Sequence, residues 1–90
     1  MFVSVWVGND LDVERAVIED ELETAFQGVG EVTGAGTGKT GCHVDAEVES
    51  GMPAAEVFKL VEKALAAAGL AVQAKVRIGD EVFMYSHPEG

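Results

Sequence analysis

Apolar and polar positions alternate with different periods along the chain, and each change of period marks a predicted element. Residues 2–7 (FVSVWV) are dense in β-branched and aromatic side chains and stop at Gly8, which is typical of a strand followed by a turn. In the next segment the apolar positions recur at helical spacing and share one face: Leu11, Ile18, Leu22, Ala25 and Phe26. We predict a helix here that Asn9 or Asp10 caps and that the glycines within residues 28–30 end.

The second half of the chain repeats this alternation. Residues 31–33 open a short strand that leads into a glycine-rich loop, and residues 42–49 alternate apolar and polar side chains like a half-buried strand. A helix is expected after Pro53, because proline suits the first helical turn, and Gly69 suits its C-terminal cap. Residues 70–78 alternate again and predict another strand.

The order of the predicted elements is β-α-β-β-α-β, and a turn at Gly79-Asp80 leads into an additional short strand over 82–85. This is the order of the split βαβ, or ferredoxin-like, fold, an α+β fold in which an antiparallel sheet carries two helices on one face. No linker, repeat or low-complexity tract interrupts the order, so residues 1–90 are expected to form a single domain.

Composition and charge narrow the class of protein. Sixteen acidic residues against six basic ones give a formal net charge of −10, and such a surface repels nucleic acid and anionic membranes but attracts basic proteins. No apolar run approaches the roughly 18 residues of a membrane helix, and the first residues lack the positive leader of a signal peptide. A single cysteine suits a reducing cytosol. We therefore expect a cytoplasmic domain that binds neither nucleic acid nor membrane.

The stretch GAGTGKTG, residues 34–41, comes closest to a catalytic motif. A phosphate-binding P-loop that ended in Gly38-Lys39-Thr40 would need glycine at position 33, where the chain has Thr33. The next residues alternate like a strand, so the helix N-terminus that holds a phosphate is missing. We interpret the stretch as a glycine-rich hairpin and expect no nucleotide or other cofactor.

Cys42 and His43 are neighbours in a predicted strand, so their side chains point to opposite faces and cannot form a nucleophile–base pair. Cys42 shares its face with apolar residues, which is typical of a buried structural thiol. The opposite face of the strand carries His43, Asp45, Glu47 and Glu49. These polar side chains are interpreted as a solvated row. No catalytic residue and no metal site are predicted.

The face of the sheet opposite the helices is the predicted binding surface. In the expected strand order the first strand lies between the third and the fourth, so that Trp6 lies between the polar row of residues 42–49 and a row of Gln73, Lys75 and Arg77. An exposed aromatic side chain inside a charged rim resembles a binding hot spot. The predicted partner-binding residues are Phe2, Trp6, His43, Asp45, Glu47 and Glu49. A second copy of the chain is an alternative occupant of this face.

Acidic residues also gather on one side of the first helix: Asp12, Glu19, Asp20 and Glu23. Close like charges on a helix are unfavourable by roughly a few tenths of a kcal/mol per pair. Either solubility or attraction of a basic partner explains such a cluster. It is the predicted secondary acidic surface.

The stretches GVGEVTGAGTG and CHVDAEVE, within residues 28–49, resemble small acidic bacterial proteins of ferredoxin-like shape. Some proteins of that kind resemble immunity proteins, which neutralise a cognate toxin. The shared feature is glycine spacing without catalytic residues. The resemblance implies a non-catalytic inhibitor that blocks a basic protein partner, such as a toxin domain.

A small-molecule sensor is the alternative function. Amino-acid-binding ACT domains share the order of elements and a glycine-containing first loop, and Gly8-Asn9-Asp10-Leu11 occupies that place here. This resemblance implies a dimer that binds its ligand near residues 8–11. An enzyme with paired acid–base carboxylates is a third class, for which the sequence supplies no convincing pair.

Overall fold

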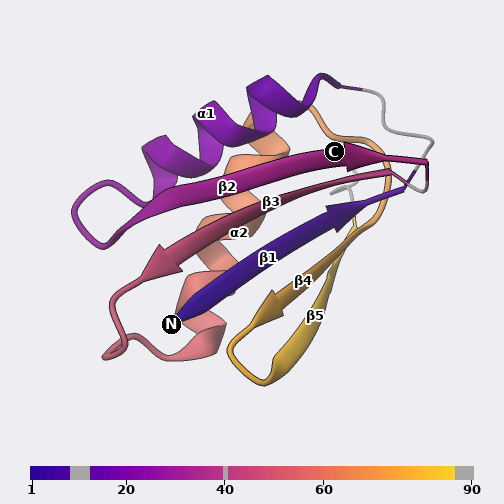
Figure 1. Cartoon of the computed structure of the whole chain (residues 1–90). Helices are drawn as coiled ribbons and strands as arrows, with labels where there is room; N and C mark the ends of the chain where they lie inside the picture. Colours follow the sequence, from indigo (N-terminus) through magenta and orange to yellow (C-terminus); the bar gives the residue numbers. More distant parts are fainter. Residues whose placement is uncertain (9–12, 40, 87–90) are drawn as a thin grey trace.

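The computed structural model describes residues 1–8, 13–39 and 41–86. These residues form an α+β domain in which a five-stranded antiparallel sheet packs against two helices (Figure 1). The elements are β1 (Phe2–Val7), α1 (Arg15–Ala25), β2 (Gly30–Gly38), β3 (Gly41–Val48), α2 (Ala54–Ala67), β4 (Ala74–Ile78) and β5 (Glu81–Tyr85). No helix in the described ranges is long and apolar enough to cross a membrane.

The strands lie in the order β2-β3-β1-β4-β5, and every neighbouring pair is antiparallel. The first strand therefore lies between the third and the fourth, as predicted. The five-stranded order differs from the classical four-stranded ferredoxin-like arrangement, because β5 is added beside β4. A two-residue turn makes this possible: Gly79 adopts a φ of 58°, which glycine reaches without a steric penalty, and Ile78 pairs directly with Glu81.

The core lies between the helices and one face of the sheet. Alternate residues of the three central strands are buried, and β1 contributes Val3, Val5 and Val7, as the sequence predicted. The helices add their apolar stripes, from Ile18 and Leu22 in α1 to the buried residues of α2. Burying one such side chain fully stabilises the fold by about 1.5–3 kcal/mol. The opposite face of the sheet is free to carry a site.

The two helices differ in how well their ends agree with the sequence-based predictions. α1 begins at Arg15, and its N-cap is Glu14, whose side chain makes no capping hydrogen bond. The predicted caps at residues 9 and 10 lie outside the described residues. The end of α2 agrees with prediction: Gly69 has a φ of 81°, and the Leu70 backbone N–H donates to the carbonyl of Leu65 in a Schellman motif.

The prediction of a short strand that leads into a glycine loop was wrong. β2 continues through the glycines to Gly38, paired with β3, and a register shift between Val32 and Gly34 marks a bulge at Thr33. The glycines alternate along the strand with Ala35 and Thr37, which lie on the side of α1. The chain continues from Gly41 as a strand, so the geometry of a P-loop is absent from this part of the chain. β4 is also shorter than predicted, since it begins only at Ala74.

Candidate functional site

The sheet face opposite the helices, which we call the open face, carries most of the exposed large apolar side chains. Within the described residues these are Phe2, Trp6, Val82 and Met84 on the open face, each 47–55% exposed, and Val17 on α1. The pairing of Lys75 with both Trp6 and Met84 places these side chains on the same side of the sheet. Exposed apolar side chains gathered on one face are typical of a binding surface.

Antiparallel register aligns the side chains of the open face in rows that run across the strands. The tryptophan row consists of Gly36, His43, Trp6, Lys75 and Met84, from β2 to β5. The serine row consists of Gly34, Asp45, Ser4, Arg77 and Val82 in the same order. Each row therefore begins at a glycine on β2, has a polar side chain on β3 and a cation on β4, and ends at an exposed apolar residue on β5.

Trp6 is held by contacts within these rows. Its ring stacks on His43 with centroids 4.7 Å apart and planes inclined by 32°. The His43 Nε2 atom lies 3.6 Å from Asp45 Oδ2, and the hydroxyl of the buried Ser4 donates to Asp45 Oδ1 over 2.9 Å. The chain of contacts from Ser4 to Trp6 fixes an aromatic side chain that remains half exposed. Such a rigid anchor loses little conformational entropy on binding.

The glycines of β2 make room for this arrangement. A Cβ atom built on Gly36 would lie 2.8 Å from Cε1 of His43, closer than ordinary van der Waals contact. Gly36 therefore lets the His43 ring lie on the open face beside Trp6. In the sequence, this arrangement is marked by glycine at every second position, at Gly34, Gly36 and Gly38. This spacing marks the outward positions of a strand rather than the predicted loop.

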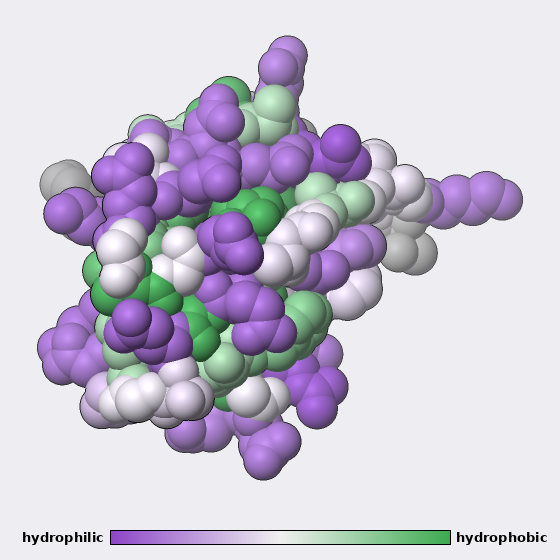
Figure 2. Space-filling view, turned by 60° about the vertical axis from the view of Figure 1, so that its left-hand side comes forward, coloured by the Kyte–Doolittle hydropathy of each residue, from purple (hydrophilic) through white to green (hydrophobic). Residues whose placement is uncertain are grey.

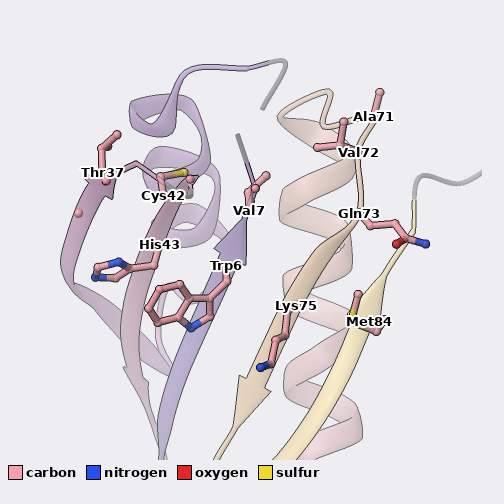
Figure 3. A pocket seen from close by; sticks show the side chains of 14 residues that line it. Trp6, Val7, Thr37, Cys42, His43, Ala71, Val72, Gln73, Lys75 and Met84 are labelled. Atoms are coloured by element: carbon pink, nitrogen blue, oxygen red, sulfur yellow. The ribbon is translucent and has the colours of Figure 1, made fainter. Parts of the chain in front are cut away.

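A pocket of about 880 Å³ opens where β1 ends, between the paired ends of β2 and β3 and the segment that precedes β4 (Figure 3). Trp6, His43 and Lys75 form part of its wall, and Gly8 and Cys42 also line it. Gln73, which was predicted to flank Trp6 on the sheet, precedes β4 and lines this pocket as well.

Cys42 is buried, which confirms the predicted burial of this thiol. Burial raises the pKa of the Cys42 thiol, while the positive charge of Arg15 acts in the opposite direction and Glu19 adds to the rise. A raised pKa leaves little thiolate at neutral pH, and the thiolate is the nucleophilic form. Cys42 therefore does not provide the pocket with an activated nucleophile.

Of the six predicted partner-binding residues, five lie together on the open face. Phe2 and Trp6 come from β1, and the row of β3 supplies His43, Asp45 and Glu47. Glu47 lies 3.3 Å from the N-terminal ammonium group. Glu49 is exposed but lies beyond the end of β3, so it does not continue the row.

The charges of the open face are balanced, which the sequence pattern alone did not indicate. Among the described residues this face carries three carboxylates, on Glu31, Asp45 and Glu47, and three cationic groups, on Lys75, Arg77 and the N-terminus. The excess of acidic residues therefore lies elsewhere. Figure 2 shows hydrophilic side chains covering most of one side of the molecule, with apolar surface between them.

The secondary acidic surface forms a groove of about 440 Å³ between α1 and the edge strand β2, which we call the α1–β2 groove. Glu19, Asp20 and Glu23 line it, together with residues 32–35 of β2. Arg15 spans one end, since its Nε donates to Glu19 Oε2 over 3.2 Å and its Nη1 donates to Thr37 Oγ1 over 2.7 Å. Asp12, the fourth predicted member, lies outside the described residues.

Comparison with known proteins gave no family assignment: no family model, no curated protein and no solved structure matches this chain. Within residues 1–8, 13–39 and 41–86, no three His, Cys, Asp or Glu side chains are grouped so that they could hold a metal ion. The open face, the pocket and the α1–β2 groove are the three candidate binding surfaces of the described residues.

Proposed function

We propose that this chain is a non-catalytic protein-binding module that captures a basic protein partner in the α1–β2 groove. The observation that carries the proposal is the lining of this groove by Glu19, Asp20 and Glu23 beside the edge strand of the sheet. α1 holds four carboxylates and one cation, whereas the open face is balanced. This distribution favours the groove over the open face as the site for a basic partner.

The edge strand suggests how the partner binds. In the part of the chain that the structure describes, β2 pairs with β3 on one side only, and an edge strand presents backbone groups that an extended segment can pair with. Lysine or arginine side chains of such a segment would reach Glu19 and Glu23 on α1. Both the backbone pairing and the ion pairs would select an extended basic segment.

An inhibitor of the toxin-neutralising type is the role that this mode of binding suits. Carboxylates that cover the basic, substrate-binding surface of a partner would block it without any chemical step. The net charge of −10 would speed the encounter by electrostatic steering, an effect that salt screens. We place this activity in the cytoplasm, in keeping with the single cysteine, which is buried and free.

Charge reversal tests the proposal with a net-charge control. One variant carries Glu19→Lys, Asp20→Lys and Glu23→Lys; the control carries the same change at Glu56, Glu62 and Glu81, which are exposed and lie away from the groove. The probe is an extended peptide of alternating lysine and valine, and the measurement is its association rate at low salt. We expect the groove variant to lose most of the binding and the control to lose little. Equal losses would mean that only net charge matters.

A small-molecule sensor is the second candidate, and the pocket at Gly8 favours it. Its volume of about 880 Å³ lies within the roughly 300–1,000 Å³ of ligand sites, and it opens where the ACT-like resemblance places a ligand. Free amino acids are the probes, and the unfolding temperature is the measurement. A rise with one amino acid, lost in Gln73→Ala, would support the sensor; no rise with any of them would exclude amino-acid sensing.

The fold class belongs to the same proposal. The order β2-β3-β1-β4 within the sheet, with a helix after β1 and after β3, supports assigning the domain to the ferredoxin-like class. β5 is then an extra strand at the edge beside β4. An experimentally determined structure with a different connection between β3 and β4 would contradict the assignment.

A further inference from the structure

The two sides of the open face are complementary in shape. On β5, Val82 and Met84 are 55% exposed and protrude from the sheet. On β2, the positions in the same rows are Gly34 and Gly36, which have no side chains. One side of β1 is therefore raised and the other is recessed.

The two sides are also complementary in charge. Asp45 and Glu47 lie on β3, on one side of β1, and Lys75 and Arg77 lie on β4, on the other side. Trp6, which is 50% exposed, lies between them. A surface whose halves match each other in shape and charge fits a second copy of itself, because a two-fold interface uses the same patch on both molecules.

We propose that the open face is the interface of a homodimer whose two-fold axis runs parallel to β1. When two sheets face each other, their two-fold axis lies in the plane between them. An axis parallel to β1 places the β3 side of one copy over the β4 side of the other. An axis across the strands would instead place the carboxylates of β3 over those of the second β3, and like charges in an interface are costly.

The axis parallel to β1 keeps each row opposite the same row of the second copy. Asp45 then faces Arg77 of the second copy, and this contact occurs twice. Trp6 faces its own counterpart at the centre, and Val82 lies over Gly34 of the second copy. Sheets that pack face to face in this way lie about 10 Å apart.

The homodimer does not depend on the proposed function, since the α1–β2 groove lies on the helix side and at the β2 edge. The carboxylates of both grooves belong to α1, on the side of the sheet away from the dimer interface. A basic partner with two suitable segments would therefore bind with the added strength of a bivalent contact.

The test is the mass of the full chain by sedimentation equilibrium over a range of micromolar concentrations. The wild-type chain should reach twice its 9.4 kDa mass. Arg77→Asp should weaken the dimer about tenfold or more, which corresponds to about 1.4 kcal/mol. The double variant Asp45→Arg with Arg77→Asp should recover most of that loss, because the exchanged charges again face each other.

Two further variants test the interface without a change at position 45. Gly34→Gln fills the recess that receives Val82 of the second copy. Within one copy, the Cβ atom at this position would have only ordinary contacts, the nearest 3.9 Å away on Asp45. This variant should weaken the dimer about tenfold or more. Lys63→Asp on α2 is the charge control and should leave the dimer unchanged. A monomeric wild-type chain, or a dimer that Arg77→Asp and Gly34→Gln leave unchanged, would overturn the proposal. A folded double variant without recovery would overturn the axis.

Discussion

Trp6 and His43 stack across neighbouring strands, with ring centroids 4.7 Å apart, on a sheet face that no described element covers. The contact depends on Gly36, because any side chain there would push against the His43 ring. The glycine-rich segment thus serves to position an exposed aromatic side chain.

Trp6→Ala should affect association more than folding. Trp6 lies outside the core, whereas Leu22 is 1% exposed in the centre of the α1 stripe, and truncating a buried leucine typically costs about 2–5 kcal/mol. Denaturant unfolding at concentrations too low for self-association measures the stability of each variant, and sedimentation equilibrium measures the dimer. We expect Trp6→Ala to be clearly less destabilising than Leu22→Ala and to lose the dimer. Comparable destabilisation with an intact dimer would show that Trp6 acts in the core.

Gly36→Ala should displace the His43 ring. The added Cβ would lie 2.8 Å from Cε1 of His43, and loss of the stacked pair should cost about 0.5–1.5 kcal/mol. Trp6 is the single tryptophan of the chain, so its fluorescence reports the change directly. At concentrations too low for self-association, Gly34→Ala is the matched control and should leave the emission unchanged, because its Cβ would lie 3.9 Å from the nearest atom, on Asp45. Identical emission from both variants would mean that the stacking does not depend on Gly36.

Cys42 should make the domain less stable at alkaline pH. Burial raises the pKa of the folded thiol, so its contribution is fully present below the pKa of the unfolded chain and is lost as pH rises through the folded pKa. The free energy of unfolding should therefore fall at alkaline pH, above the ordinary thiol value of 9.0, and fall less steeply in Cys42→Ala. Parallel pH profiles of the two proteins would contradict this. The folded protein should also react slowly with thiol reagents at neutral pH.

Nucleotide binding should be absent. Thr33 occupies the position where a P-loop needs glycine, and β3 lies where a helix would be required. Calorimetric titration with ATP or GTP and magnesium should show only the heat of dilution. Micromolar affinity that Lys39→Ala removes would contradict this interpretation.

Strand β1 and its two faces could be predicted from the sequence, because β-branched residues are dense in it and alternation assigns every second side chain to the core. The neighbours of Trp6 followed from the strand order. The continuation of β2 beyond residue 33 could not be predicted, because local rules treat glycine as a strand breaker, and the fit of Gly36 to the His43 ring appears only once β2 pairs with β3. The charge balance of the open face also escaped prediction, since it depends on the N-terminal ammonium beside Glu47, a contact between distant parts of the chain.

The first residue of α1 could not be predicted either. Apolar spacing marks the face of a helix but not its first residue, and Glu14 caps α1 without a side-chain hydrogen bond. The α1–β2 groove depends on how α1 lies along β2, and the spacing of apolar residues within α1 does not determine that position.

The burial of Trp6 between two copies of the chain is tested most directly by its fluorescence as a function of protein concentration. The monomer leaves this indole 50% exposed, so dilute protein should emit at long wavelength and be quenched readily by acrylamide. As the concentration of the wild-type chain rises, the emission should shift to shorter wavelength and quenching should fall. In Arg77→Asp the same changes should occur only at higher protein concentration. Emission and quenching that stay the same at every concentration would contradict a protein interface on the open face.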